Sequence, residues 1–176
     1  MNDASLAADI DAIARLTGRF TLRSGQIAPE YFDKYRFESD PALLQRVARA
    51  MLDLVPPGTD VLAGLELGGV PIATAMSLIS GLPAVFVRKQ AKTYGTCQAV
   101  EGAEVRGRRV VLVEDVITTG GAVADAERLV REAGADVATV VCAIWRGDGA
   151  PRIEAAPGLV VRAALTKTDL DAAARR

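Results

Sequence analysis

The 176-residue chain contains no histidine. This absence excludes serine or cysteine nucleophiles activated by an imidazole, histidine zinc sites, and acid–base catalysis by imidazole. The chain also has only two cysteines, Cys97 and Cys142, which are too few for a disulfide framework. An enzyme with this composition has to work with carboxylates, lysine, arginine, backbone amides or a bound metal ion.

The chain also lacks an excess of charge of one sign and lacks a long apolar run. Its formal net charge is −1, which argues against a general nucleic-acid binder. Residues 1–5 show no basic segment leading into an apolar one, and no apolar stretch is long enough to span a membrane. We therefore expect a cytoplasmic globular protein that binds neither membranes nor nucleic acid. Its length suits one domain over residues 1–176.

The first forty residues predict short elements. Apolar side chains at helical spacing predict a helix over 3–16, which Gly18 would end. Residues 20–25 predict a short strand that leads into a turn, and the aromatic-rich residues 31–37 predict a second strand. We expect residues 1–40 to form a small N-terminal hood rather than a separate domain.

In the remaining core, residues 41–176, strand patterns alternate with helix patterns. Asp40 before Pro41 predicts a helix start, because aspartate caps free amides and proline fits the first turn. The polar residues 90–108 show little periodicity and predict a long loop. The alternation indicates an α/β fold with a parallel sheet flanked by helices. The predicted strands are 61–65, 84–87, 109–113, 137–144 and 159–165, and the predicted helices are 41–54, 69–80, 122–133 and 169–176.

The most informative stretch is residues 110–122, VVLVEDVITTGGA. An aliphatic run that predicts a buried parallel strand leads into Glu114 and Asp115, and a turn of small residues then opens a helix. Open α/β sheets bind ligands beyond the carboxyl ends of their strands, and such a helix start offers backbone N–H groups to a phosphate. The two carboxylates suit ribose hydroxyls or a cation shared with phosphates. The stretch therefore predicts a ligand with a phosphate, a sugar and a metal ion.

Two other predicted strand ends carry groups that suit such a ligand. Residues 66–69, Glu-Leu-Gly-Gly, are either an ordinary strand–helix turn or a loop whose amides hold diphosphate. Residues 88–95, RKQAKTYG, place three cations within five residues. They are either a solvated basic stretch or the groups that neutralise a departing diphosphate. Gly95 and the polar residues after it would let this loop open and close.

Residues 110–122 resemble the 5-phosphoribosyl 1-diphosphate (PRPP) motif of the type I phosphoribosyltransferases. Residues 88–95 are similar to the catalytic loop of the orotate phosphoribosyltransferase family. Residues 20–25, Phe-Thr-Leu-Arg-Ser-Gly, look like that family's N-terminal substrate segment, and Tyr31-Phe32 look like its aromatic pair beside orotate. Arg146, after a predicted strand, matches the arginine that meets the orotate carboxylate. The resemblance spans nearly the whole chain and implies a type I phosphoribosyltransferase core with a small N-terminal hood.

The resemblance also implies a reaction and a set of site residues. The reaction is transfer of ribose 5-phosphate from PRPP to N1 of orotate, giving orotidine 5′-monophosphate and diphosphate in pyrimidine biosynthesis, with Mg²⁺ held mainly through PRPP. The residues implied to be catalytic are Lys92, Lys89, Arg88, Asp115 and Glu114. Those implied to bind PRPP are Arg88, Lys89, Lys92, Tyr94, Glu114, Asp115, Val116, Ile117, Thr118, Thr119, Gly120, Gly121, Ala122, Glu66, Leu67, Gly68 and Gly69. Those implied to bind orotate are Thr118, Arg146, Arg23, Tyr31 and Phe32.

Three residues depart from the common family pattern. Tyr94 stands where many members have histidine, Glu114 where aspartate is common, and Arg23 where some members have lysine. These departures put a proton-donating role for Tyr94 in doubt, but they remove no charge that the reaction needs. The family also implies a homodimer in which residues 90–108 close over the neighbouring subunit's substrates.

Two alternative functions remain open on the sequence. An enzyme with the same core could act on a purine base, although a purine would leave Arg146 and Arg23 without a carboxylate to meet. A regulator could instead keep the PRPP site as a sensor and bind nucleic acid. That second alternative needs a basic surface, which the net charge of −1 does not indicate.

Overall fold

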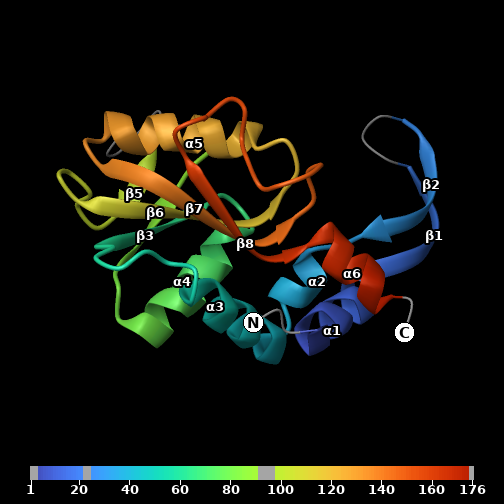
Figure 1. Ribbon diagram of the computed structural model, residues 1–176. Coiled ribbons are helices and arrows are strands. Elements are labelled where there is room, and N and C mark those ends of the chain that lie inside the picture. The colour runs from blue at the N-terminus through green and yellow to red at the C-terminus, as the bar shows by residue number, and fades with distance from the viewer. Residues whose placement is uncertain (1–3, 22–24, 91–97, 175–176) are drawn as a thin grey trace.

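A computed structural model describes residues 4–21, 25–90 and 98–174 of the chain (Figure 1). Its centre is a six-stranded sheet made of β3 (Val61–Leu65), β4 (Ala84–Val87), β5 (Val100–Gly102), β6 (Arg109–Ile117), β7 (Asp136–Trp145) and β8 (Val160–Thr166). The strand order is β5-β4-β3-β6-β7-β8. All neighbouring strands are parallel except the edge strand β5, which runs antiparallel to β4. The α/β class and the mostly parallel sheet are confirmed.

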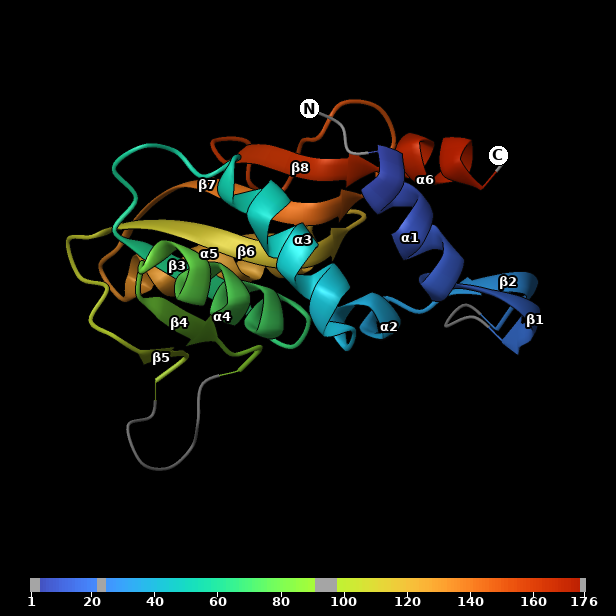
Figure 2. The ribbon, with the colours of Figure 1, turned by 90° about the horizontal axis from the view of Figure 1, so that it is seen from below.

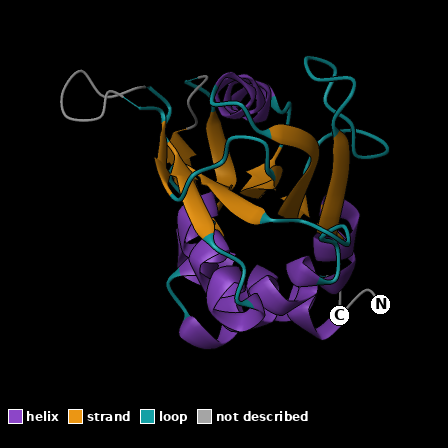
Figure 3. Cartoon of the chain, turned by 90° about the vertical axis from the view of Figure 1, so that its left-hand side faces the viewer, coloured by secondary structure: helices purple, strands orange, loops and turns teal. Residues whose placement is uncertain are grey.

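Helices cover both faces of this sheet. One helix, α5 (Gly121–Glu132), lies on one face, and α1 (Ala4–Ala14), α3 (Pro41–Leu52) and α4 (Gly69–Ser80) lie on the other (Figures 1 and 3). The central strand β6 divides its side chains between the two sides: Val110 and Leu112 pack in the core under α5, and Val111 and Val113 pack in the core with the other helices. Side chains of a strand alternate between faces, so a strand buried on both faces is apolar throughout.

The N-terminal residues form a hairpin of β1 (Arg15–Thr21) and β2 (Ile27–Phe32), followed by the short helix α2 (Tyr35–Glu38). The chain ends in α6 (Lys167–Ala173), which packs against α1. In Figure 2 the arrow of β8 points toward α1 and the hairpin, so these elements lie beside the carboxyl end of the sheet. Nevertheless α1 also contributes to the main core, since Leu6 and Ile10 are buried in the same cluster as α3 and α4.

Two predictions for the hood are wrong. The first helix ends at Ala14 rather than at residue 16, and Gly18 lies within β1 instead of ending the helix. The cause is long-range, because Arg15 pairs in register with Phe32 of β2. The predicted strand 31–37 is also wrong, because β2 ends at Phe32 and a helical turn follows. The Asp33 carboxylate accepts a hydrogen bond of 3.2 Å from the Tyr35 N–H, which starts that turn.

Most predictions for the core are confirmed to within a few residues. The bounds of β3, α4 and β4 are as predicted, and α3 begins at Pro41, where the Asp40 carboxylate accepts hydrogen bonds of 2.9 Å from the N–H groups of Ala42 and Leu43. The helix ends at Leu52, two residues earlier than predicted. The bounds of α5, β7 and β8 shift by one residue, and α6 begins two residues and ends three residues earlier than predicted.

Two differences in the core matter for the site. The predicted loop 90–108 contains β5, which pairs with β4, and the Arg88 N–H donates to the Ala99 carbonyl at 2.8 Å. The central strand β6 continues to Ile117, so Glu114 and Asp115 lie within the strand rather than beyond its end. Across the described residues, no helix combines the length and the apolar character that crossing a membrane requires.

Candidate active site

The turn between β6 and α5 has the geometry of a phosphate site. Gly120, at the start of α5, has φ 79°, a left-handed conformation that favours glycine. A Cβ at this position would also lie 2.5 Å from the Ile153 side chain. No side chain of the described residues caps α5, so its first amide groups have no intrahelical acceptor and can donate to an anion. The turn predicted from the small residues 118–121 is therefore suited to hold a phosphate.

This turn forms one wall of a cavity of about 230 Å³. The predicted residues that line it are Glu66, Leu67, Lys89, Glu114, Val116, Ile117, Thr118, Thr119, Gly120, Gly121 and Ala122. A neighbouring cavity of about 280 Å³ shares Glu66, Lys89, Glu114 and Ala122 and adds Arg88. The Lys89 N–H donates to Glu66 Oε2 at 3.0 Å, which joins the two predicted strand-end loops. The structure thus brings together the phosphate turn, the side chain of Glu114, the 66–69 turn, and Arg88 and Lys89 at the start of the basic stretch.

Asp115 takes a different position from Glu114. Its side chain is completely buried and lines neither cavity, and its Oδ2 lies 2.5 Å from Lys34 Nζ. A Cβ on Gly68 would lie 1.6 Å from the same oxygen, so the 66–69 turn can pack here only because this residue is glycine. A Cβ on Gly69 would likewise clash with the Val113 carbonyl oxygen. The two glycines therefore fit the turn against β6 and do not line either cavity.

Glu114, Asp115 and Lys34 shift one another's pKa values. Burial raises the pKa of Glu114 well above its usual range, and the adjacent Asp115 adds to the effect. In Asp115 burial opposes ionisation, but hydrogen bonds with Glu114 and Lys34 outweigh it, so its pKa is lowered. Burial also opposes charge on Lys34, but the ion pair with Asp115 prevails and raises the pKa of the ammonium group. Asp115 and Lys34 are thus a charged pair behind Glu114.

Sequence reasoning missed Lys34 and Tyr35, which line the cavity, and Glu38, which adjoins Asp115. Lys34 immediately precedes α2 and Glu38 is the last residue of that helix, four positions later, and residues at this spacing share one helix face. That spacing is present in the sequence, but residues 31–37 predict a strand, which would not bring Lys34 into a helical pair with Glu38.

Arg146 lies beside the phosphate turn. Its N–H donates to the Ile117 carbonyl at 2.8 Å, and its guanidinium lies 4.9 Å from the centre of the Phe32 ring. Burial, and to a lesser degree the nearby Arg15, lowers the pKa of Arg146. Tyr31 instead packs against Phe20, with ring centres 5.6 Å apart. Of the predicted aromatic pair, Phe32 is therefore the member in contact with Arg146, since neighbouring residues of a strand face opposite ways.

Three predicted site residues, Arg23, Lys92 and Tyr94, lie outside the described residues. Their roles stay predictions. Gly95 and Cys97 also lie outside the described residues, and Cys142 is buried in β7.

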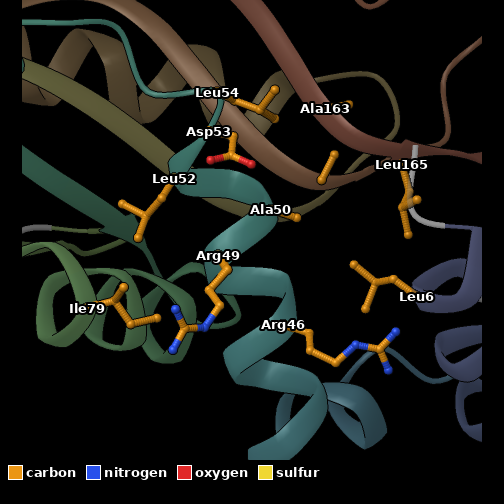
Figure 4. A pocket seen from close by; sticks show the side chains of 11 residues that line it. Leu6, Arg46, Arg49, Ala50, Leu52, Asp53, Leu54, Ile79, Ala163 and Leu165 are labelled. Atoms are coloured by element: carbon orange, nitrogen blue, oxygen red, sulfur yellow. The ribbon is translucent and has the colours of Figure 1, made fainter. Parts of the chain in front are cut away.

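A larger cavity of about 600 Å³ lies elsewhere, between α1, α3, α4 and β8 (Figure 4). Its two arginines do not converge: Arg46 extends toward Leu6, and Arg49 extends toward Ile79. Arg46 is also paired with Asp9 at 2.5 Å. This cavity therefore lacks the converging charges of the site at the carboxyl end of the sheet.

Comparisons with known proteins show what the chain is similar to. A family model described as the phosphoribosyl transferase domain matches residues 36–160. An orotate phosphoribosyltransferase of Nocardioides sp. is 66% identical over 171 residues, covering 97% of this chain and 96% of that protein. The crystal structure of Mycobacterium tuberculosis H37Rv orotate phosphoribosyltransferase with Fe(III) dicitrate has a TM-score of 0.85 and 36% identity, covering 97% of this chain and 99% of that one. The structure of the same enzyme with PRPP has a TM-score of 0.81 and 33% identity, with the same coverage.

Proposed function

Because this chain belongs to the phosphoribosyl transferase family, and within it to the orotate phosphoribosyltransferases, we propose a role for each part of its site in the transfer of ribose 5-phosphate from PRPP to N1 of orotate. The family resemblance drawn from the motifs is confirmed, and the pathway is pyrimidine biosynthesis. The observation that carries the assignment of roles is the meeting of the phosphate turn, Glu114, Lys89 and the 66–69 turn around one cavity. Arg146 is joined to the end of the same strand.

PRPP fits this arrangement part by part. The amides of residues 118–122 hold the 5-phosphate, as anions bind at a helix N-terminus. Glu114 accepts hydrogen bonds from the ribose hydroxyls. Arg88 and Lys89 face the diphosphate, and the family match adds Lys92 to them. The positive groups lie where negative charge develops, which is the most effective place for electrostatic catalysis.

Arg146 and Thr118 hold orotate. A guanidinium pairs well with a carboxylate, and Arg146 is already oriented by Phe32, so we assign it to the orotate carboxylate. Thr118 adds a hydrogen bond. The N1 atom of orotate forms a bond to C1 of the ribose while the bond from C1 to the diphosphate oxygen breaks. The diphosphate leaves with the bonding electrons and takes up the proton that N1 loses. The protein supplies no covalent nucleophile, so catalysis is mainly positioning and charge stabilisation.

We also propose that Mg²⁺ binds together with PRPP. Within the described ranges no group of three or more aspartate, glutamate or cysteine side chains is arranged to hold a metal ion. In such sites Mg²⁺ keeps several waters and binds largely through substrate phosphates. PRPP oxygens, rather than protein side chains, would hold the ion, which when bound neutralises part of the diphosphate charge.

The assignment is tested by assaying product formation from PRPP with orotate, adenine, hypoxanthine and uracil in parallel. We expect turnover with orotate and none above background with the other three bases. Faster turnover with either purine would replace the substrate assignment, and no turnover with any base would favour the PRPP-sensing regulator.

Arg146→Ala should raise the KM for orotate by about tenfold to a hundredfold and leave the KM for PRPP nearly unchanged. The reason is that a charge-assisted contact of this type contributes roughly 1.5–3 kcal/mol. Steady-state kinetics with each substrate varied in turn would measure both constants. Arg152→Ala is the matched control, because Arg152 is an exposed arginine on the same connection and pairs with Glu154. Equal rises in both constants would indicate a structural role for Arg146 instead.

A further inference from the structure

Helix α2 presents two side chains to the buried Asp115. Lys34 Nζ lies 2.5 Å from Asp115 Oδ2, and the buried Glu38 carboxyl group lies beside the Asp115 carboxylate. Both carboxyl groups border the same point on the 66–69 turn: a Cβ on Gly68 would lie 1.6 Å from Asp115 Oδ2 and 2.9 Å from Glu38 Oε1. Glu38 therefore reaches the same place as Lys34, behind the cavity wall.

Two buried carboxyl groups that lie side by side are stable together only if one of them carries a proton. Glu38 is buried, and its Oε1 receives no N–H or hydroxyl donor from the residues that the structure describes. A proton on Glu38 that is donated to Asp115 supplies the missing hydrogen and prevents two negative charges from meeting in a buried site.

The surrounding charges also favour a proton at this point. The titratable groups around the pair are Asp33, Lys34, Tyr35, Glu114 and Cys142. Four carboxyl groups, those of Asp33, Glu38, Glu114 and Asp115, thus stand around the ammonium group of Lys34. Burial first, and then the negative charge of Asp115, raise the pKa of Glu38 to about 9.

We propose that Glu38 is a positioning residue for the transfer reaction: it holds a proton against Asp115 and, together with Lys34, fixes that carboxylate as an anion behind Glu114. This inference rests on the proposed function. The fixed anion stabilises positive charge on the ribose ring, and the pair seats the 66–69 turn, which borders the cavity. If Glu38 were ionised, its repulsion from Asp115 would displace both the carboxylate and the turn.

The pH dependence of activity tests this role. Glu38→Gln keeps the shape and the hydrogen-bond donor but cannot ionise. In the unaltered protein kcat/KM for PRPP should fall about tenfold per pH unit above the pKa of Glu38, and Glu38→Gln should lack this fall between about pH 7 and about pH 10. Glu38→Ala should lower kcat/KM by up to about a hundredfold across the range, since misplaced groups lose that much. Glu132→Gln, at an exposed glutamate paired with Arg128, is the matched control.

Thermal stability provides a second, independent readout. The Glu38 pKa is raised in the folded protein from 4.5 to about 9, so unfolding between these pH values releases a proton. The contribution of the protonated group to stability is therefore complete below pH 4.5 and decreases as the pH rises toward 9. The melting temperature of Glu38→Gln relative to the unaltered protein should consequently rise across this window. A constant difference would mean that Glu38 only fills space.

The possible results distinguish failure of the role of Glu38 from failure of the proposed function. If the unaltered protein does not use orotate, the proposed function fails, while the melting curves still report whether Glu38 holds a proton. If the unaltered protein is active and Glu38→Gln shows the same alkaline fall in kcat/KM, the positioning role is overturned. A Glu38→Gln protein that loses the alkaline fall and gains relative stability with pH supports it.

Discussion

Asp115→Asn should fold normally and lose about 10²–10³ in kcat, because removal of one preorganised electrostatic group at a reacting centre has an effect of this size. Asp115 is completely buried and ion-paired with Lys34, and its low pKa keeps it charged at neutral pH. Asparagine has nearly the same shape but no charge. The ribose would then lose the buried anion that stabilises its developing positive charge.

The fold should survive because asparagine keeps the shape of aspartate, and its amide oxygen can still accept a hydrogen bond from Lys34. The Lys34 side chain is 32% exposed, so its ammonium group also stays in contact with water. Circular dichroism and melting curves would verify the fold, and kcat would be measured with both substrates saturating. Asp136→Asn, at an exposed aspartate that begins β7, is the matched control. Near-normal turnover in a folded Asp115→Asn protein would contradict the role of this residue.

The core was predictable because its signals are local. Residues 61–65 are apolar and buried at every position, and Gly81, with φ 77°, ends the helix that follows them. Such runs and end signals depend only on a few neighbouring residues. The phosphate turn was predictable for the same reason, since its small residues and the helix after it are contiguous in sequence.

The errors arose where pairing with distant residues decided the structure. Arg15 continues a helical pattern in sequence, yet it contacts Glu30 and Asp171 and pairs in register with β2. The three residues of β5 carry too weak a strand signal to compete with their polar surroundings, and they form a strand because β4 offers an edge. Tertiary contacts override local propensity in both cases.

The site itself was only partly predictable. The sequence indicated that Glu114 and Asp115 would act alike, but neighbouring residues of a strand point to opposite faces. Glu114 therefore reaches the cavity, whereas Asp115 points to the face covered by α2. The partners Lys34 and Glu38 come from a helix far away in the chain, and no local pattern links them to β6.

We further propose that the chain acts as a homodimer and that Lys92 serves the site of the partner subunit. The connection that carries Lys92 leaves and rejoins the sheet at one point, because the Arg88 N–H donates to the Ala99 carbonyl at 2.8 Å. Ten residues, 89–98, lie between these two positions. Such a connection is long for a link between two neighbouring strands. The family resemblance implies that it closes over the neighbouring subunit's substrates.

Mixing two inactive variants would test whether Lys92 acts in the partner's site. Lys92→Ala and Asp115→Asn would be unfolded together in equal amounts and refolded. Random pairing makes half of the dimers mixed. If Lys92 acts across the interface, one of the two sites in each mixed dimer has both residues intact. Roughly a quarter of the activity should then return. If Lys92 acts within its own subunit, every site in a mixed dimer lacks one residue. A refolded sample that contains mixed dimers by mass and stays inactive would therefore exclude the shared loop.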